Sequence, residues 1–178
     1  MKLYQLSFDY AFALADVIES LDSSDSLELC PERPELIKCF KYGWIMKEST
    51  VVPDFVLIMS SLLGCKHRIL GDVKNVTNNL NFTPVKISDD EYVVFSNLPI
   101  LSDCINIKKS KVSRFSNGEI MEISNPVFYP KEYPALFKVK DIPSSYFCNE
   151  IFRDVIIDKQ YTGLLFKECN IKSKNRKW

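Results

Sequence analysis

The sequence predicts one folded domain of the α+β class, residues 1–178, with a largely antiparallel sheet and two or three helices packed on it. Short apolar runs separated by turn signals recur through the middle and the C-terminal part of the chain, and such runs favour strands. Aromatic residues make up 12% of the chain, which also indicates several strands. Three other segments have the apolar spacing of amphipathic helices. A chain of this length buries roughly 70% of its unfolded surface, enough for one core.

The N-terminal third mixes both kinds of pattern. Residues Met1–Ser7 alternate apolar and polar side chains, which predicts an edge strand. Residues Ala11–Leu21 have helix-like apolar spacing and good helix formers, so they predict the first helix. The polar run Asp22–Ser26 then predicts an exposed acidic loop. A strand is plausible at Cys39–Met46, and Phe55–Met59 is an apolar run too short for a helix.

The middle of the chain predicts a helix followed by strands. The helix is expected at Gly71–Asn79. Four strand-like runs follow: Thr83–Ile87, Glu91–Phe95, Val112–Phe115 and Glu119–Ile123. Asn117-Gly118 predicts a two-residue hairpin turn between the last two runs, in which both turn residues have positive φ.

The C-terminal part predicts a strand, a helix and a further strand. An apolar run at Ala135–Val139 precedes an amphipathic helix at Asn149–Asp158, and the turn Tyr161–Gly163 leads into Leu164–Phe166. The order of helix, aromatic-Thr turn and strand resembles that of residues 69–85. Chance similarity is one explanation, and a true repeat would imply two helix–strand units on one shared sheet. The core is expected to contain Phe55, Leu57, Ile69, Val73, Val85, Val93, Phe95, Ile120, Phe128, Phe137, Phe147, Phe152, Ile156, Leu164 and Phe166.

The charge is unevenly distributed along a chain whose net charge is zero. Residues 1–36 hold eight acidic and two basic side chains, a balance of −6, whereas residues 104–178 hold eight acidic and fourteen basic side chains, a balance of +6. Solvated faces that neutralise each other would explain this asymmetry. An acidic patch that docks a basic active site is the alternative.

The cysteines and the hydropathy indicate a cytoplasmic protein. The six cysteines are scattered, and no C-x-x-C pair is present for zinc or redox chemistry, so buried reduced thiols are expected. No window reaches the ~20 apolar residues that span a bilayer, and the N-terminal residues lack the apolar core of a secretory signal. We therefore expect no membrane association.

Few residues have the spacing that catalysis requires. The sequence contains one histidine, His67, which lies between Lys66 and Arg68. Zinc sites with two or three histidine ligands are therefore excluded. A Cys–His dyad formed in space stays an alternative. No glycine loop for phosphate is present, and the carboxylates Asp89–Glu91 predict a polar turn. The sequence therefore predicts no cofactor, no metal and no catalytic residues.

Two basic runs are the best candidates for nucleic-acid binding. Lys108, Lys109 and Lys111 precede Arg114 and Phe115, and the tail at residues 170–178 is also basic. Lysines that protect a solvated strand edge explain the first run equally well. Direct nucleic-acid binding is not expected.

Several short motifs resemble a bacterial immunity-protein family. In order, they are Pro53-Asp54-Phe55, the helix Gly71–Asn79, Pro84-Val85, Tyr92, Asp103 with Ser110, and Phe152–Phe166. The region 52–168 resembles the eleventh immunity-protein family, formerly a domain of unknown function, whose members neutralise polymorphic toxins. Residues 1–50 would be a variable N-terminal part.

The resemblance implies a cytoplasmic inhibitor that is not an enzyme and that blocks the active site of a cognate toxin, such as a nuclease or another cytoplasm-acting effector. An adaptor or scaffold without a toxin partner, or an enzyme with an unrecognised site, remain the alternatives. If the toxin has a basic cleft, a cluster of carboxylates would fill it. The partner-binding residues expected from this argument are Asp16, Glu19, Asp22, Asp25 and Glu28, with Asp16 and Glu19 on one helix face.

Overall fold

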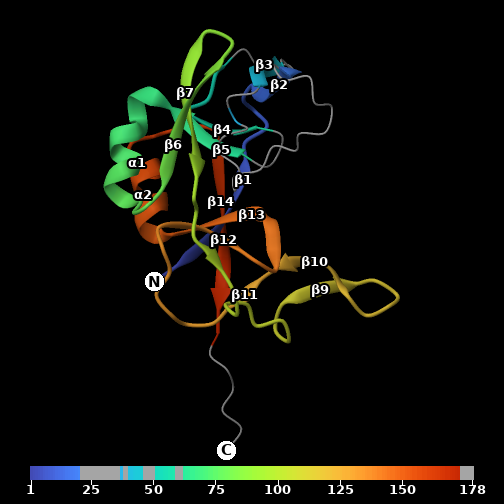
Figure 1. Ribbon diagram of the computed structural model, residues 1–178. Coiled ribbons are helices and arrows are strands. Elements are labelled where there is room, and N and C mark those ends of the chain that lie inside the picture. The colour runs from blue at the N-terminus through green and yellow to red at the C-terminus, as the bar shows by residue number, and fades with distance from the viewer. Residues whose placement is uncertain (21–36, 38–39, 46–50, 59–61, 173–178) are drawn as a thin grey trace, which may run out of the picture. The chain divides into compact units, whose positions relative to one another are not determined.

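The computed structural model describes residues 1–20, 37, 40–45, 51–58 and 62–172 (Figure 1). The chain divides into two compact units. Unit 1 comprises residues 1–7, 99–153 and 166–178, and unit 2 comprises residues 8–98 and 154–165. This division does not test the prediction of a single domain, because helix α2 (Glu150–Asp158) and strand β14 (Leu164–Ile171) each contain residues of both units.

Unit 1 contains a six-stranded sheet in the order β11-β14-β1-β13-β12-β8. Besides β14, its strands are β1 (Leu3–Phe8), β8 (Ile100–Leu101), β11 (Val127–Phe128), β12 (Leu136–Val139) and β13 (Ile142–Asn149). Strands β1 and β12 both run antiparallel to β13, whereas β11 is parallel to β14 and β8 to β12. The N-terminal residues thus form a strand as predicted, but the edge position is wrong because β1 lies between β14 and β13.

The core of unit 1 is built from aromatic rings. Phe128 packs edge-on against Phe147 with the ring centroids 5.3 Å apart, and Phe137 stacks on Phe147 at 5.8 Å. All three rings are fully buried. Aromatic pairs at these distances add to the stabilisation that comes from buried area alone.

A separate two-stranded ribbon completes unit 1. Its strands are β9 (Lys111–Arg114) and β10 (Ile120–Asn125), and Figure 1 shows the ribbon extending away from the strands β11 and β12. The predicted hairpin is confirmed, but the predicted turn conformation is wrong, because Gly118 has a positive φ (+87°) and Asn117 does not. The turn closes through a hydrogen bond from the Gly118 amide to the Phe115 carbonyl (2.9 Å).

Unit 2 contains a second six-stranded sheet, in the order β2-β3-β6-β7-β5-β4. The strands are β2 (Leu14–Ser20), β3 (Phe40–Ile45), β4 (Phe55–Ile58), β5 (Leu62–Lys66), β6 (Asn81–Ile87) and β7 (Asp90–Ser96). Neighbours are antiparallel except for β3 and β6, which are parallel. The core of this sheet includes Ile37, Val56, Ile58, Leu62, Ile87 and Val94.

The helices predicted at Gly71–Asn79 and Asn149–Asp158 are confirmed. Helix α1 (Leu70–Val76) follows a 3₁₀ helix (His67–Ile69), and α2 covers almost all of the predicted segment. Asn149 caps α2, since its side-chain oxygen accepts hydrogen bonds from the amides of Ile151 (3.0 Å) and Phe152 (3.3 Å). Among the described residues, no helix is long and apolar enough to cross a membrane.

The predicted α+β class is wrong, because the described residues are mostly strand and their two α-helices contain 7 and 9 residues. The third predicted helix, Ala11–Leu21, is wrong, because its residues Leu14–Ser20 form strand β2, which pairs with β3. Helix formers such as Ala15 and Glu19 do not prevent this, since tertiary pairing overrides local propensity, and Val17 and Ile18 suit a strand.

Most of the predicted core is confirmed. Ile120 is an error, being 37% exposed on the ribbon, and Leu57, Val85 and Phe166 are half-buried. The prediction that the two helix–strand units share one sheet is also wrong, because β6 and β14 belong to different sheets. Four of the cysteines are free and buried, namely Cys65, Cys104, Cys148 and Cys169, and the other two lie outside the described residues.

Candidate functional site

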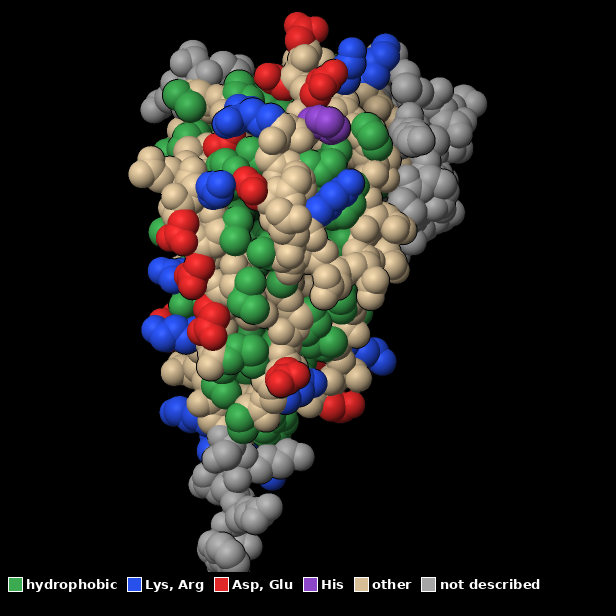
Figure 2. Space-filling view, turned by 90° about the vertical axis from the view of Figure 1, so that its left-hand side faces the viewer, with side chains coloured by type: hydrophobic (Ala, Val, Ile, Leu, Met, Phe, Trp, Pro, Cys, Tyr) green, Lys and Arg blue, Asp and Glu red, His purple; other side chains and the backbone are tan. Residues whose placement is uncertain are grey.

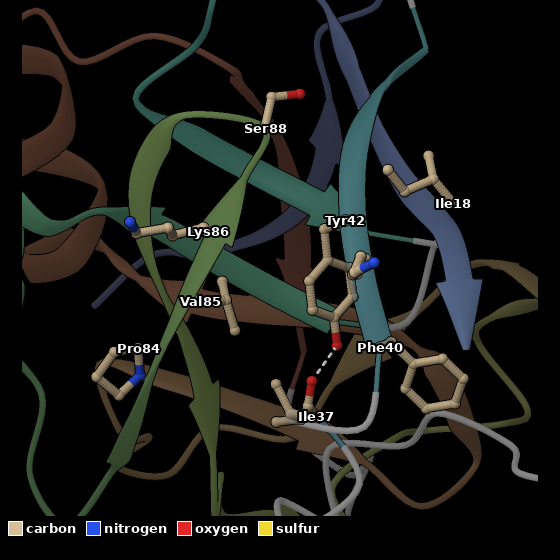
Figure 3. Close-up of a pocket in the computed structure, with 9 residues that line it drawn as sticks. Ile18, Ile37, Phe40, Tyr42, Pro84, Val85, Lys86 and Ser88 are labelled. Carbon is tan, nitrogen blue, oxygen red and sulfur yellow. Dashed lines mark hydrogen bonds between the residues drawn. The ribbon is translucent and has the colours of Figure 1, made fainter. Parts of the chain in front are cut away.

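Unit 2 has a groove where strands β3 and β6 diverge (Figure 3). These strands share one Cα pair, Tyr42 with Ile87, and the Ser88 amide donates to the Tyr42 carbonyl at 3.0 Å. Beyond this point the strands separate and leave a groove of about 420 Å³. It is lined by Ile18, Ile37, Phe40, Lys41, Tyr42, Pro84, Val85, Lys86 and Ser88.

The floor of this groove is held by Tyr42. Its hydroxyl donates a hydrogen bond to the Ile37 carbonyl at 2.6 Å, so the ring lies between the two strands (Figure 3). The side chain of Val85 points toward this space from β6, whereas that of Lys86 points away from it (Figure 3), and Lys41 adds one cation to the lining. The groove therefore combines an apolar floor with positive charge, and its described lining residues include no pair of acid and base groups for catalysis.

A more polar hollow of about 390 Å³ lies at the end of β5 and is lined by Lys66, His67, Arg68, Asp90 and Glu91. Figure 2 shows the histidine at the surface with cationic and acidic side chains around it. His67 and Arg68 are both exposed. Asp90 also accepts a hydrogen bond from the Trp44 indole at 3.0 Å, which links the β6–β7 turn to β3.

A buried carboxylate, Asp54, organises the neighbouring part of unit 2. One of its oxygens, Oδ1, accepts a hydrogen bond from Arg68 Nη2 and lies 3.8 Å from Lys66 Nζ. The other, Oδ2, accepts from both the amide and the hydroxyl of Thr162, each at 3.1 Å. The Asp54 side chain is 9% exposed, so these partners compensate a charge that is almost removed from water.

The backbone on either side of Asp54 is held equally closely. The Asp54 amide donates to Thr162 Oγ1 at 3.1 Å, and the Phe55 amide donates to the Thr162 carbonyl at 2.9 Å. The Tyr92 hydroxyl donates to the Pro53 carbonyl. We call Pro53, Asp54, Arg68, Tyr92 and Thr162 the Asp54 cluster.

A second contact ties helix α1 to the chain that follows α2. The Tyr161 hydroxyl donates to Asp72 Oδ2, and Lys159 Nζ lies 3.9 Å from the same oxygen. The hydrogen bond to the carboxylate and, secondarily, burial raise the pKa of Tyr161 to about 12. The phenol therefore stays protonated and donating at neutral pH.

The Cys–His alternative is not supported by the environment of Cys65, which precedes His67 by two residues. Burial, with a smaller contribution from the charge of Asp54, raises the pKa of the Cys65 thiol to about 12. A thiol in this state is not a nucleophile at neutral pH. Among the described residues, no three or more His, Cys, Asp or Glu side chains are grouped so that they could hold a metal ion.

The raised pKa of Cys65 predicts a loss of stability at alkaline pH. The unfolded thiol loses its proton near pH 9, whereas the folded thiol keeps it up to about pH 12. The contribution is thus fully present below pH 9 and is lost as the pH rises toward 12. In urea titrations at pH 8 to 11, Cys65→Ala should show a shallower decline of the unfolding free energy than the wild type. Parallel declines would contradict the assignment.

The structure does not bring the predicted acidic site together on a helix face. Asp16 is half-buried on β2, opposite Gly43 of β3, and Glu19 lies on the same strand opposite Lys41, beyond a register shift between Val17 and Glu19. The helical spacing argument for Asp16 and Glu19 is therefore wrong. The other three residues, Asp22, Asp25 and Glu28, lie outside the described part of the chain, so the site itself stays a prediction.

Sequence reasoning missed how the Asp54 cluster forms. The pairs Pro53-Asp54 and Thr162-Gly163 are both among the motifs that resemble the immunity family, but they are 108 residues apart. A Pro-Asp pair and a Thr-Gly turn are common, and neither signals a contact.

No protein-family model matches the chain, and no curated protein matches its sequence. The immunity-family resemblance therefore depends on the order and spacing of the short motifs.

Proposed function

We propose that this protein is a cytoplasmic immunity protein that binds a cognate antibacterial toxin and neutralises it without catalysing a reaction. The observation that supports the proposal most directly is the Asp54 cluster. Asp54, near the start of the resembling region, contacts Thr162 near its end. Three of the motifs that carry the resemblance, those with Asp54, Tyr92 and Thr162, thus meet in one cluster of unit 2, as motifs shared by a family would.

The surface also suits binding to a protein. The β3–β6 groove offers apolar side chains beside Lys41, and the hollow at the end of β5 offers Arg68, Asp90 and Glu91. Interfaces typically combine an apolar centre with a charged rim that selects the partner and speeds association. An inhibitor of this kind works by covering the toxin's active site, so its own residues need only bind.

The test begins with the reading frame beside the gene. A neighbouring toxin, expressed in the cytoplasm of a bacterial host, should stop growth, and co-expression of this protein should restore it. Calorimetry with an inactive toxin variant should give a one-to-one complex. Toxicity that persists despite soluble co-expressed protein, together with no heat of binding, would contradict the proposal and favour an adaptor or an enzyme.

The acidic N-terminal segment gives a further prediction about this complex. If Asp22 and Asp25 face a basic cleft of the toxin, the double reversal Asp22→Lys, Asp25→Lys should slow association and flatten its salt dependence. The melting temperature should change little. The matched control is Glu132→Lys, Asp141→Lys, at two exposed carboxylates of unit 1. Stopped-flow association rates that are equal in both double variants would refute the site.

A further inference from the structure

The tip of the β9–β10 ribbon presents the dipeptide Asn117-Gly118 to solvent. Both residues are exposed, and so are the apolar side chains of Phe115 and Met121, which are each 53% exposed. Nothing lies within 4 Å of the position that a Cβ at Gly118 would occupy. Because Gly118 carries no side chain, its backbone nitrogen can approach the side-chain carbonyl carbon of Asn117 without steric hindrance.

These two groups can react with each other without a catalyst. The Gly118 nitrogen loses its proton and bonds to Asn117 Cγ, which closes a cyclic imide. The bond between Cγ and Nδ2 breaks, and Nδ2 takes up a proton and leaves as ammonia. Water then opens the ring at either carbonyl carbon, which gives aspartate or, where the main chain continues through Cγ, isoaspartate. Water is the only co-reactant.

In the native turn, each of the reacting groups is held by a hydrogen bond. The attacking nitrogen, that of Gly118, donates to the Phe115 carbonyl at 2.9 Å. The carbonyl oxygen under attack, Asn117 Oδ1, accepts from the Glu119 amide at 3.0 Å, and the leaving group, Asn117 Nδ2, donates to Glu119 Oε2 at 2.9 Å. The reaction requires these bonds to break, so its rate follows the population of the open turn.

The tip can open while the base of the ribbon stays in place. At the base, Ile123 is buried in the core of unit 1, and its cross-strand partner Val112 packs against that core. Ser110 Oγ accepts a hydrogen bond from the Val127 amide and donates to the Asn106 carbonyl, both at 2.9 Å. The tip has no such anchor, and a two-stranded ribbon by itself is marginally stable in water. Local opening therefore does not require global unfolding.

The reaction also removes the interactions that close the turn. An aspartate at position 117 lacks the Nδ2 donor and places a second carboxylate beside that of Glu119, so the two like charges repel. An isoaspartate lengthens the main chain inside the turn, which displaces the Gly118 amide from the Phe115 carbonyl.

We propose that Asn117 is a site of spontaneous, one-way conversion to aspartate and isoaspartate, which proceeds when the tip of the ribbon opens and prevents the turn from re-forming. Glu119 is the positioning residue that slows the conversion, because its side chain holds Asn117 Nδ2. The modification needs neither an enzyme nor a partner.

The test uses peptide mass maps of the whole protein after ageing in mildly alkaline buffer, with and without guanidinium chloride. Asn117 should be converted in both solutions, at least about tenfold more slowly in the native protein, because several hydrogen bonds must break first. Asn125, also exposed on the ribbon, is the internal control and should stay intact, since the next residue, Pro126, has no N–H. An unmodified Asn117 in denaturant overturns the site, and equal rates in the two solutions overturn its protection by the turn.

Two variants test the role of Glu119. Glu119→Ala should speed the native conversion about fivefold, the effect of one lost hydrogen bond, and should not change the rate in denaturant. The matched control is Glu122→Ala, at an exposed carboxylate that lies opposite Ser113. It should leave both rates unchanged. Equal acceleration by both variants would indicate a general effect of charge and would overturn the assignment of Glu119.

Limited proteolysis tests whether the turn stays open. Arg114 Nη1 donates to the Gly118 carbonyl at 2.8 Å in the closed turn. Trypsin should cut after Arg114 faster in the aged protein than in fresh protein, because the modified tip is no longer closed. An unchanged rate of cleavage in protein that is fully converted at Asn117 would show that the turn re-forms, which overturns the one-way character of the site.

Discussion

Replacing Asp54 with alanine should lower the free energy of unfolding by about 2–4 kcal/mol, because a nearly buried acceptor of several hydrogen bonds is removed and its part-buried donors lose their partner. The change deletes the acceptor for Arg68 Nη2 and for both the amide and the hydroxyl of Thr162. Lys66, whose side chain is 22% exposed, also loses its nearby carboxylate. The cost comes chiefly from donors and charges that stay buried without a partner, rather than from the lost contacts themselves.

Three variants separate the contributions, with urea denaturation as the measurement. Asp54→Asn keeps one acceptor and the shape of the side chain, so it should lose less than Asp54→Ala. Thr162→Val removes only the hydroxyl and should cost about 1–2 kcal/mol. Arg68→Gln should be nearly neutral, because the Arg68 side chain is 66% exposed and its pairing is screened by water. An Asp54→Ala protein as stable as Arg68→Gln would show that the cluster does not hold this part of unit 2 together.

Local pattern was sufficient where the element was local. Helix α2 could be predicted because its apolar spacing and its cap, Asn149, lie within the segment itself. The ribbon could be predicted for the same reason, since Asn117-Gly118 separates two strand-like runs. Only the turn conformation differs from the prediction. The Asn117 side-chain oxygen accepts a hydrogen bond from the Glu119 amide, and Gly118 has positive φ whereas Asn117 does not.

Long-range pairing decided the elements that could not be predicted. The segment Ala11–Leu21 has the periodicity of a helix, but its strand β2 is stabilised by pairing with residues of β3 that are 20 to 31 positions away in the sequence. The fold class changed with it, because this helix was one of the three on which the α+β prediction depended. The Asp54 cluster could not be predicted for the same reason, because Asp54 and Thr162 are 108 residues apart and only the fold brings them together.

Exposure was the property hardest to predict for the ribbon. An isoleucine in a strand-like run is usually buried, so Ile120 was assigned to the core. The basic residues before it were explained as protection of a solvated strand edge. That explanation is compatible with the ribbon, whose edges have no partner among the described strands, but it does not account for the apolar tip.

Gly163 occupies the most restricted backbone position of the Asp54 region. Its φ is +102°, a conformation that side chains with a Cβ rarely adopt. A Cβ built at this residue would lie 2.2 Å from the Phe55 carbonyl oxygen and 2.8 Å from Pro53 Cβ. The Gly163 carbonyl also accepts a hydrogen bond from the Asp9 amide at 3.1 Å, so the backbone cannot shift freely. The close approach of residues 53–55 to the Thr-Gly turn therefore requires glycine.

Gly163→Ala should consequently lower the free energy of unfolding by more than about 4 kcal/mol, in the range of severe single substitutions, since backbone strain and steric overlap add.

Two other glycines separate these effects. Gly118→Ala, at φ +87° with nothing within 4 Å of the new Cβ, should cost only the strain, about 1–2 kcal/mol. Gly71→Ala, in α1 with open space around it, should stabilise by roughly 0.5–1 kcal/mol. Urea midpoints of the three variants should follow the order Gly71→Ala, Gly118→Ala, Gly163→Ala from most to least stable. If Gly163→Ala were no worse than Gly118→Ala, the close packing of the Thr-Gly turn against Phe55 would be disproved, and with it the geometry that joins the two family-like motifs.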